Sequence, residues 1–278
     1  DSAVSRGLGD VYKRQPKYQA AIDADVQTIM ASYNSWNGVK CHGSKELLTD
    51  ILKIEMGFDG FVISDWQGID EIPGDYKSDI ITSINAGIDM VMVSGQGQPY
   101  KKFMRLLKES VEEGSIPLAR IDDAVKRILK VKIRNGLFDN PLVENDALKV
   151  IGSDAHRDIA RQAVRESVVV LKNDDIIPIS KDSKSIVVAG RGADNLGMQC
   201  GGWTINWQGG QGDITIGTTI LDGIKKSVSA ETNVIYSKDG QDLNDVDGEL
   251  AVVVIGEDPY TEFFGDKDNL DLLNDDIN

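Results

Sequence analysis

Gly57 to Asp70 reads G-F-D-G-F-V-I-S-D-W-Q-G-I-D, an apolar run that ends in a carboxylate and an indole. Phe61-Val62-Ile63 predicts a buried strand with Asp65 and Trp66 at its C-terminal tip. Active sites of parallel α/β folds are built at such tips. The pair suits sugar chemistry, because the carboxylate can react while the flat ring stacks on a pyranose. Taken alone, Asp65 is equally well explained as a helix N-cap or a solvated loop acid.

A second segment repeats this pattern far along the chain. Ala251 to Asp266 reads A-V-V-V-I-G-E-D-P-Y-T-E-F-F-G-D. We expect a strand over Ala251–Ile255, so the loop Glu257–Glu262 lies beyond its C-terminal tip. Carboxylates therefore follow two predicted strands.

The first half of the chain alternates predicted strands and helices. We expect strands at Val26–Tyr33, Phe61–Ser64 and Ile88–Val93. The predicted helices are a segment capped by Ser44 and closed by Gly57, then Ser78–Asn85, Tyr100–Glu113 and Arg120–Arg134, with Gly114 and Gly136 ending the last two. Three βα units of this kind predict part of a (β/α)8 barrel, which needs eight strands to close.

The second half predicts a separate α/β unit. Residues 140–152 are polar and contain a proline, which indicates a linker between domains at 16–139 and 153–278. His156 lies in a predicted helix, where a surface or interdomain contact explains it. The expected strands are Val168–Leu171, Ile186–Ala189, Asn233–Tyr236 and Ala251–Ile255.

The first residues fit neither domain. Asp1–Gln15 shows no sustained hydrophobic period and lacks the apolar core of a signal peptide. We expect residues 1–15 to be non-native or disordered, with a native polar arm as the alternative.

Composition excludes several function classes. Lys and Arg number 30 against 45 acidic residues, a net charge of −15, which argues against nucleic acid or an anionic membrane as partner. The chain has two cysteines and two histidines, so neither a disulfide framework nor a histidine-rich metal site is expected. We expect no metal and no cofactor.

Two short motifs are weak signals. Gly190-Arg191-Gly192 follows a predicted strand, but Asn195 occupies the third glycine position of a dinucleotide fingerprint, so nucleotide binding is not expected. Cys41-His42 are neighbours, and neighbours in a strand point to opposite faces. We interpret them as a packed thiol and a loop imidazole.

Four blocks of sequence carry a resemblance to glycoside hydrolase family 3, in its exo-β-glucanase and β-glucosidase branch. They are S-Y-N-S-W-N-G-V-K at 32–40, G-F-V-I-S-D-W-Q-G-I-D at 60–70, C-G-G-W-T-I-N-W-Q-G at 200–209 and G-E-D-P-Y-T-E at 256–262. The resemblance implies an α/β fold: the C-terminal part of a (β/α)8 barrel followed by an incomplete α/β sandwich.

The resemblance also implies an activity and its residues. It implies a retaining hydrolase that releases glucose from the non-reducing ends of β-glucans or β-glucosides, with β-linked glucose oligosaccharides as partners. Asp65 falls on the nucleophile and Glu262 on the general acid/base. Trp66 and Trp207 would sandwich the sugar of the +1 subsite. Tyr33 would line the pocket near Asp65, and Trp203 would support it. Asp70, Glu257 and Asp258 are taken as ordinary loop acids.

The resemblance further implies that part of the family fold is missing. A Lys-His pair, an arginine and an aspartate that hold the sugar in the family have no counterpart here. We therefore expect this chain by itself to be an inactive fragment, with periplasmic or secreted location expected for the full-length parent. Two alternatives stay open: a non-catalytic carbohydrate-binding or scaffold fragment, and acids that hold a metal. The preference for β-1,3 or β-1,4 linkages and the oligomeric state stay open too.

Overall fold

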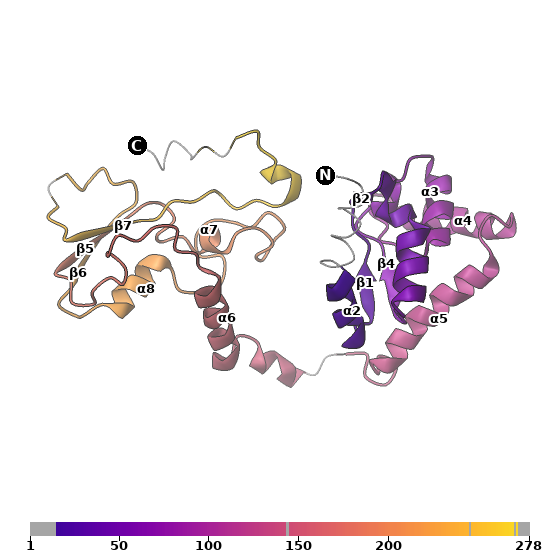
Figure 1. Ribbon diagram of the computed structural model, residues 1–278, viewed down its shortest axis with the longest axis horizontal. Helices are drawn as coiled ribbons and strands as arrows, with labels where there is room; N and C mark the ends of the chain where they lie inside the picture. The colour runs from indigo at the N-terminus through magenta and orange to yellow at the C-terminus, as the bar shows by residue number, and fades with distance from the viewer. Residues whose placement is uncertain (1–14, 143–144, 245, 270, 272–278) are drawn as a thin grey trace. The chain divides into compact units, whose positions relative to one another are not determined.

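The computed structural model describes residues 15–142, 145–244, 246–269 and 271. The chain divides into two compact units, Asp1–Arg161 and Gln162–Asn278, and each is described by itself (Figure 1). Of the N-terminal stretch expected to be non-native or disordered, residues 1–14 lie outside the described residues. Gln15 is already the first residue of helix α2, Gln15–Asp23.

Two parallel strands form the centre of the first unit. β1, Thr28–Met30, pairs with β4, Phe61–Ile63, in the register Thr28↔Phe61. Both lie within strands that the sequence predicts. Parallel pairing aligns the carboxyl ends of the two strands at one edge, where Asp65 follows β4.

The third predicted strand, Ile88–Val93, is wrong in extent. Its contribution to the sheet is a single parallel bridge between Ile63 and Met90. Side chains replace part of the expected ladder here: the Val62 N–H donates to Asp89 Oδ2 at 2.8 Å, and the Met92 N–H donates to Ser64 Oγ at 2.8 Å. A strand whose partners are side chains leaves the regular backbone pattern.

A short hairpin precedes β4 and carries His42. β2, Ser35–Trp36, pairs antiparallel with β3, Val39–Lys40. Asn37 and Gly38 join them with φ of 49° and 81°, as an Asn-Gly turn of type I′ requires. The 3-10 turn η2, Cys41–Gly43, follows directly.

The predicted helices of the first unit are all present. Ser44 Oγ accepts the Leu47 N–H at the start of η3, Glu46–Glu55, as the sequence predicts for a cap, although η3 is wound as a π-helix. α3, Tyr76–Ala86, begins with a reciprocal capping box between Asp75 and Ser78. α4 spans Pro99–Glu112, and α5 spans Leu118–Arg134 next to β4 (Figure 1).

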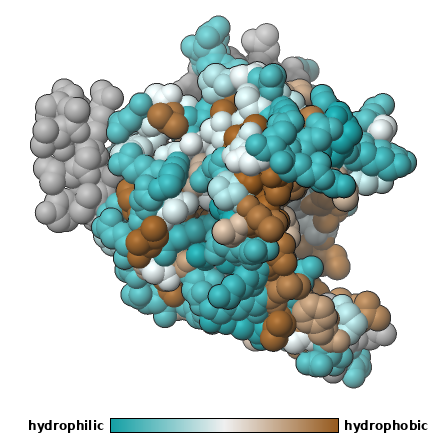
Figure 2. All heavy atoms as spheres, turned by 90° about the vertical axis from the view of Figure 1, so that its right-hand side faces the viewer, coloured by the Kyte–Doolittle hydropathy of each residue, from teal (hydrophilic) through white to brown (hydrophobic). Residues whose placement is uncertain are grey.

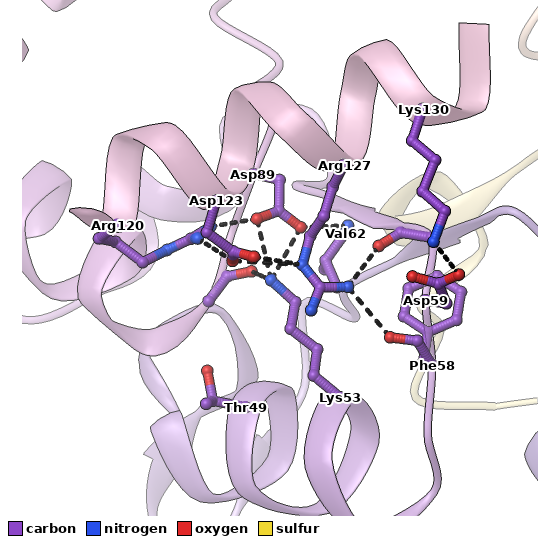
Figure 3. Close-up of polar contacts among 12 residues, drawn as sticks. Thr49, Lys53, Phe58, Asp59, Val62, Asp89, Arg120, Asp123, Arg127 and Lys130 are labelled. Atoms are coloured by element: carbon purple, nitrogen blue, oxygen red, sulfur yellow. Dashed lines mark hydrogen bonds and ion pairs between the residues drawn. The ribbon is translucent and has the colours of Figure 1, made fainter. Parts of the chain in front are cut away.

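A buried ionic network ties α5 to the strands (Figure 3). The Asp89 side chain is 0 % exposed and accepts from Lys53 Nζ at 2.8 Å and from Arg120. Arg127 Nη1 donates to the carbonyls of Phe58 at 3.0 Å and Gly60 at 2.8 Å, immediately before β4. Burial lowers the pKa of Lys53 to about 8, against the opposing attraction of Asp89.

The second unit is built on a three-stranded parallel sheet. Its order is β6-β5-β7, with β5 at Ser185–Ala189, β6 at Asn233–Ser237 and β7 at Leu250–Val253. Helix α8, Ile220–Ser227, packs Leu221 against Ile186 and Val188 of the central strand. The short helix α7 spans Leu196–Cys200. The 3-10 segment η5, Asn145–Val150, belongs to the first unit, and α6, Asp154–Ser167, contains the boundary between the two units.

Two expectations for this unit need correction. The segment Val168–Leu171 is exposed and is not a strand. A strand forms where a neighbouring backbone satisfies its N–H and C=O groups, and no described strand pairs with this segment. β7 ends at Val253, two residues before the predicted Ile255.

The face of the first unit that Figure 2 shows is mainly hydrophilic with apolar strips. Figure 2 shows such strips on the side that α4 and α5 face. Val125, Leu129 and Ile133 are exposed apolar residues of α5. Among the described residues, every helix is too short or too polar to cross a bilayer.

Candidate active site

Asp65 sits in a tight turn directly after β4. Its carboxylate Oδ1 accepts the N–H of Trp66 at 2.6 Å. Its backbone carbonyl accepts from Ser64 Oγ at 2.9 Å and from the Gly68 N–H at 3.0 Å. Gln67 adopts a left-handed φ of 55°, which closes the turn. The nucleophile that the sequence predicts is therefore half-buried and held by hydrogen bonds of its own loop.

His42 contacts this turn from the hairpin. The Asp65 N–H donates to His42 Nε2 at 3.0 Å, and the imidazole is fully buried. The ring of Tyr33 meets the imidazole edge-on, with centroids 6.0 Å apart and an interplanar angle of 70°. The interpretation of His42 as a loop imidazole is wrong, because the 3-10 turn η2 points the side chain into the fold.

Burial decides the charge of His42. Loss of hydration lowers the pKa of the imidazole; the Asp65 carboxylate opposes this shift and Lys40 adds to it. A hydrogen bond accepted at Nε2 also requires that nitrogen to be unprotonated. His42 is thus a neutral acceptor at the backbone of Asp65.

Glu262 begins a short turn after the last strand of the second unit. It is the first residue of the 3-10 segment η6, Glu262–Gly265, and its φ is 53°. Non-glycine residues adopt this left-handed conformation rarely, so the surroundings must impose it. The residue before it, Thr261, is buried. The carboxylate that the sequence predicts as acid/base is exposed within its unit.

The loop at 201–212, which contains Trp203 and Trp207 and is called the tryptophan loop here, holds the Glu262 turn in place. Gln208 Oε1 accepts the Thr261 N–H at 3.1 Å, and Gln208 Nε2 donates to Thr261 Oγ1 at 2.8 Å. Thr261 Oγ1 donates in turn to the Trp207 carbonyl at 3.1 Å. A Cβ on Gly202 would lie 2.2 Å from Thr261 Cγ2, so the two loops meet closely enough to require glycine.

The tryptophans of this loop differ in their surroundings. Trp207 packs edge-on against Phe263 and Phe264, with centroids 5.8 and 5.7 Å away. Trp207 is 39 % exposed, compared with 69 % for Trp203. The Trp203 N–H donates to the Trp207 carbonyl at 3.0 Å, so Trp203 braces the loop through its backbone. In the first unit Trp66 is 59 % exposed.

Neighbouring carboxylates have partners of their own. Glu257 accepts from the Tyr260 hydroxyl at 2.7 Å and from Lys267 at 2.9 Å, and the Tyr260 hydrogen bond is the main cause that lowers the pKa of Glu257. Asp258 pairs with Arg191. Within the described ranges, no three His, Cys, Asp or Glu side chains gather as a metal site would require.

The structure groups the predicted site residues into two sets. Tyr33, Asp65 and Trp66 lie in the first unit, whereas Trp203, Trp207 and Glu262 lie in the second. The pairing of Asp65 with Glu262 joins the two units and stays a prediction. Sequence reasoning missed His42 as a contact of Asp65 and Gln208 as a contact of Thr261. For His42, the sequence signal was the Asn-Gly hairpin just before it. For Gln208, the sequence carried no signal.

Comparison with known proteins identifies the class as glycosyl hydrolases. The N-terminal domain of glycosyl hydrolase family 3 matches residues 12–131, and the C-terminal domain of the same family matches residues 168–277. The chain belongs to glycosyl hydrolase family 3, as the sequence blocks predict.

Individual relatives agree. The chain is 34 % identical to a lysosomal beta glucosidase of Dictyostelium discoideum over 92 % of its own length and 34 % of the relative's. It is 31 % identical to a beta-xylosidase of Formosa agariphila over 97 % of its own length and 41 % of the relative's. The chain therefore spans roughly a third to two fifths of the length of these two relatives.

A solved structure extends the comparison to the fold. The exo-1,3/1,4-beta-glucanase of a Pseudoalteromonas species is 41 % identical, with a TM-score of 0.79 over 89 % of this chain and 32 % of that one. The predicted α/β fold, part of a (β/α)8 barrel followed by part of an α/β sandwich, is confirmed by this likeness and by the two family matches.

Proposed function

We propose that this sequence forms part of a retaining glycoside hydrolase that releases glucose from the non-reducing ends of β-glucans or β-glucosides. The observation that carries the proposal is the setting of Asp65. Its half-buried carboxylate follows a buried parallel strand and is oriented by the Trp66 N–H at 2.6 Å. Similarity to a beta glucosidase and an exo-1,3/1,4-beta-glucanase supports the reaction class.

The mechanism assigns different tasks to two carboxylates. Asp65 attacks the anomeric carbon while Glu262 donates its proton to the departing glycosidic oxygen, which leaves a glycosyl ester on Asp65. Glu262, now ionised, then takes a proton from water as the water oxygen attacks the same carbon and releases Asp65. Two inversions retain the β-configuration. In such retaining enzymes the two carboxyl groups lie about 5–5.5 Å apart.

Aromatic side chains supply the sugar-binding surfaces. We assign Trp66 and Trp207 to opposite faces of the sugar in the +1 subsite, Tyr33 to the pocket near Asp65, and Trp203 to support of the loop. The exposed rings of Trp66 and Trp207 are consistent with these roles. Aromatic faces suit pyranoses because burial of large flat apolar surfaces is favourable.

The relatives point to two sugars. The likeness to a beta glucosidase and a beta-glucanase favours glucose, and the beta-xylosidase relative makes a β-xyloside the competing substrate. Parallel assays on nitrophenyl glucoside and xyloside, laminaribiose and cellobiose would rank both the sugar and the linkage.

Domain boundaries and location are also proposals. We assign 16–139 to the barrel part, 140–152 to a linker and 153–278 to the sandwich part. A periplasmic or secreted complete protein suits a glucan too large to enter a cell, and an export-reporter fusion would test this location.

A second candidate is a non-catalytic carbohydrate-binding or scaffold role for the chain as written. The observation that favours it is the small extent of the sheet in the first unit: in the described residues β1 pairs with β4, one bridge joins Met90, and β2–β3 is a separate hairpin. Glucose binding by this chain without turnover, together with an inactive complete gene product, would favour this candidate.

Trapping the intermediate tests the catalytic proposal in the complete gene product that contains this sequence. A 2-fluoro β-glucoside with a good leaving group should label one peptide, and that peptide should contain Asp65. Asp65→Ala should abolish turnover and labelling. Glu262→Ala should lose activity and regain it with azide, giving a β-glucosyl azide. Label on another residue, or an active Asp65→Ala variant, would overturn the assignment.

A further inference from the structure

We propose that His42 is a positioning residue: its imidazole accepts the backbone N–H of Asp65 and thereby fixes the direction of the Asp65 carboxylate. The inference rests on the proposed function, because it assigns a task to His42 relative to the proposed nucleophile.

The imidazole contacts both ends of the turn that carries the nucleophile. At one end His42 Nε2 lies 3.0 Å from the Asp65 nitrogen. At the other end a Cβ on Gly68 would lie 2.3 Å from the same Nε2, so glycine alone leaves room for the ring. His42 arrives from the turn after the β2–β3 hairpin, whereas the turn that carries Asp65 follows β4. The turn after the hairpin therefore contacts a loop that follows a different strand of the unit.

Backbone and carboxylate move together at Asp65. Oδ1 accepts the Trp66 N–H at 2.6 Å, and the Asp65 carbonyl accepts the Gly68 N–H at 3.0 Å. Rotation of the Asp65 backbone would therefore turn the carboxylate with it. A group that holds the Asp65 N–H holds the attacking oxygen, and misplacement by about 1 Å can lower a rate on the order of 100-fold.

The imidazole can do this only when neutral. Because Nε2 accepts, the ring proton belongs on Nδ1, and Nδ1 has no hydrogen-bond partner in the described part of the chain. The titratable groups around the ring are Asp65, Lys40, Tyr33 and the adjacent Cys41. Burial lowers the pKa of His42 and so favours the neutral ring, in agreement with the hydrogen bond that Nε2 accepts. Protonation of Nε2 would point its N–H at the N–H of Asp65, so that two donors would face each other.

Two variants of His42 distinguish a positioning role from a role in packing alone, because the two roles predict opposite orders of activity. His42→Gln places an amide oxygen near the position of Nε2 and keeps an acceptor that does not titrate. His42→Leu keeps an apolar volume and removes the acceptor. If His42 only fills space, His42→Leu should be the more active variant, because a buried site tolerates an apolar side chain better than an unpaired amide. Positioning favours glutamine.

Nitrogen NMR tests the contact in this chain, without requiring activity. The chain has two histidines, so the exposed His156, removed by His156→Gln, completes the assignment. Long-range proton–nitrogen spectra at neutral pH should show His42 protonated at Nδ1 and bare at Nε2. The Asp65 amide signal should move in His42→Leu and stay close to wild type in His156→Gln. A His42 protonated at Nε2 would overturn the proposal.

Kinetics in the complete gene product tests the consequence. His42→Leu should slow labelling of Asp65 by the 2-fluoro glucoside on the order of 100-fold, measured well below the melting temperatures of both His42 variants. His42→Gln should keep labelling within about tenfold of wild type. If Asp65 were labelled in His42→Leu as fast as or faster than in His42→Gln, the positioning role would be wrong. If Asp65→Ala still turns over substrate, the proposed function fails instead, whatever the two His42 variants do.

Discussion

Gln208 brackets Thr261, the residue before Glu262, with two hydrogen bonds: it accepts the Thr261 N–H at 3.1 Å and donates to Thr261 Oγ1 at 2.8 Å. One side chain thus satisfies both the backbone and the hydroxyl of a buried residue. Because Glu262 has a left-handed backbone, its direction depends on what holds its neighbour.

We predict that Gln208→Leu impairs proton donation more than nucleophilic attack. General acid catalysis contributes about 10²–10⁴-fold where the leaving group is poor and little where it is good. In the complete gene product the variant should lose far more activity on cellobiose than on dinitrophenyl glucoside. Gln199→Leu, on the exposed side of α7, is the matched control and should change both rates equally little. Equal losses on both substrates in Gln208→Leu would contradict the prediction.

Removal of the buried charge at Asp89 should destabilise the first unit. Asp89→Asn leaves Lys53 and Arg120 without their shared carboxylate in a site where the Asp89 side chain is 0 % exposed. Loss of one member of a buried ionic group costs about 3–5 kcal/mol. Urea unfolding of the chain, followed by tryptophan fluorescence, measures the change. Asp50→Asn removes a carboxylate from the exposed pair with Lys45 and should cost about 0–1 kcal/mol.

Asp79 should make stability depend on pH. Burial is the main cause that raises its pKa to about 6, followed by repulsion from Asp70 and Asp75, and Oδ1 lacks a hydrogen-bond partner within the described chain. A carboxyl whose folded pKa exceeds its unfolded value near 3.8 favours folding as pH falls from about 6 towards 4. Above pH 6 the ionised group opposes folding.

Asp79→Asn should therefore stabilise the chain by about 1–3 kcal/mol at pH 8, with the gain disappearing towards pH 4. Urea unfolding at a series of pH values gives the slope. Asp122→Asn, an exposed carboxylate on α5, is the control. A constant difference between Asp79→Asn and wild type across this range would refute the assignment of the slope to Asp79.

The chain as written should hydrolyse aryl β-glucosides orders of magnitude more slowly than the complete gene product. The first unit exposes Val125, Leu129 and Ile133 on α5, which indicates an apolar face without a cover in the described structure. A nitrophenol-release assay on both proteins, with light scattering to monitor aggregation, compares them. Equal specific activities would show that the pocket is complete without further sequence.

Sequence reasoning succeeded where a single local pattern determined the element. Helices α4 and α5 carry apolar periodicity and end next to Gly114 and Gly136, and β4 and β5 are short apolar runs. It failed at Ile88–Val93, where Asp89 and Ser64 side chains replace ladder bonds. Hydrogen-bond partners of that kind depend on tertiary contact and leave no period in the sequence.

The candidate site divides in the same way. Asp65, Trp66 and Glu262 stand in loops after strands, a position that pattern and family resemblance both mark. His42 acts on Asp65 through its backbone, and Gln208 acts on Glu262 through Thr261. Contacts to a backbone N–H place few demands on the identity of the contacted residue. No motif therefore announces them.

The position of the Asp89 network has a practical consequence. Arg127 grips the carbonyls of Phe58 and Gly60 where β4 begins, and Asp65 follows where β4 ends. Opposite ends of one short strand thus have different contacts: the Arg127 guanidinium before its start and the His42 imidazole after its end. Substitutions near Lys53 and Arg120, which pair with Asp89, could therefore be screened for thermal stability. Substitutions near Asp65 could be screened separately for activity on other sugars.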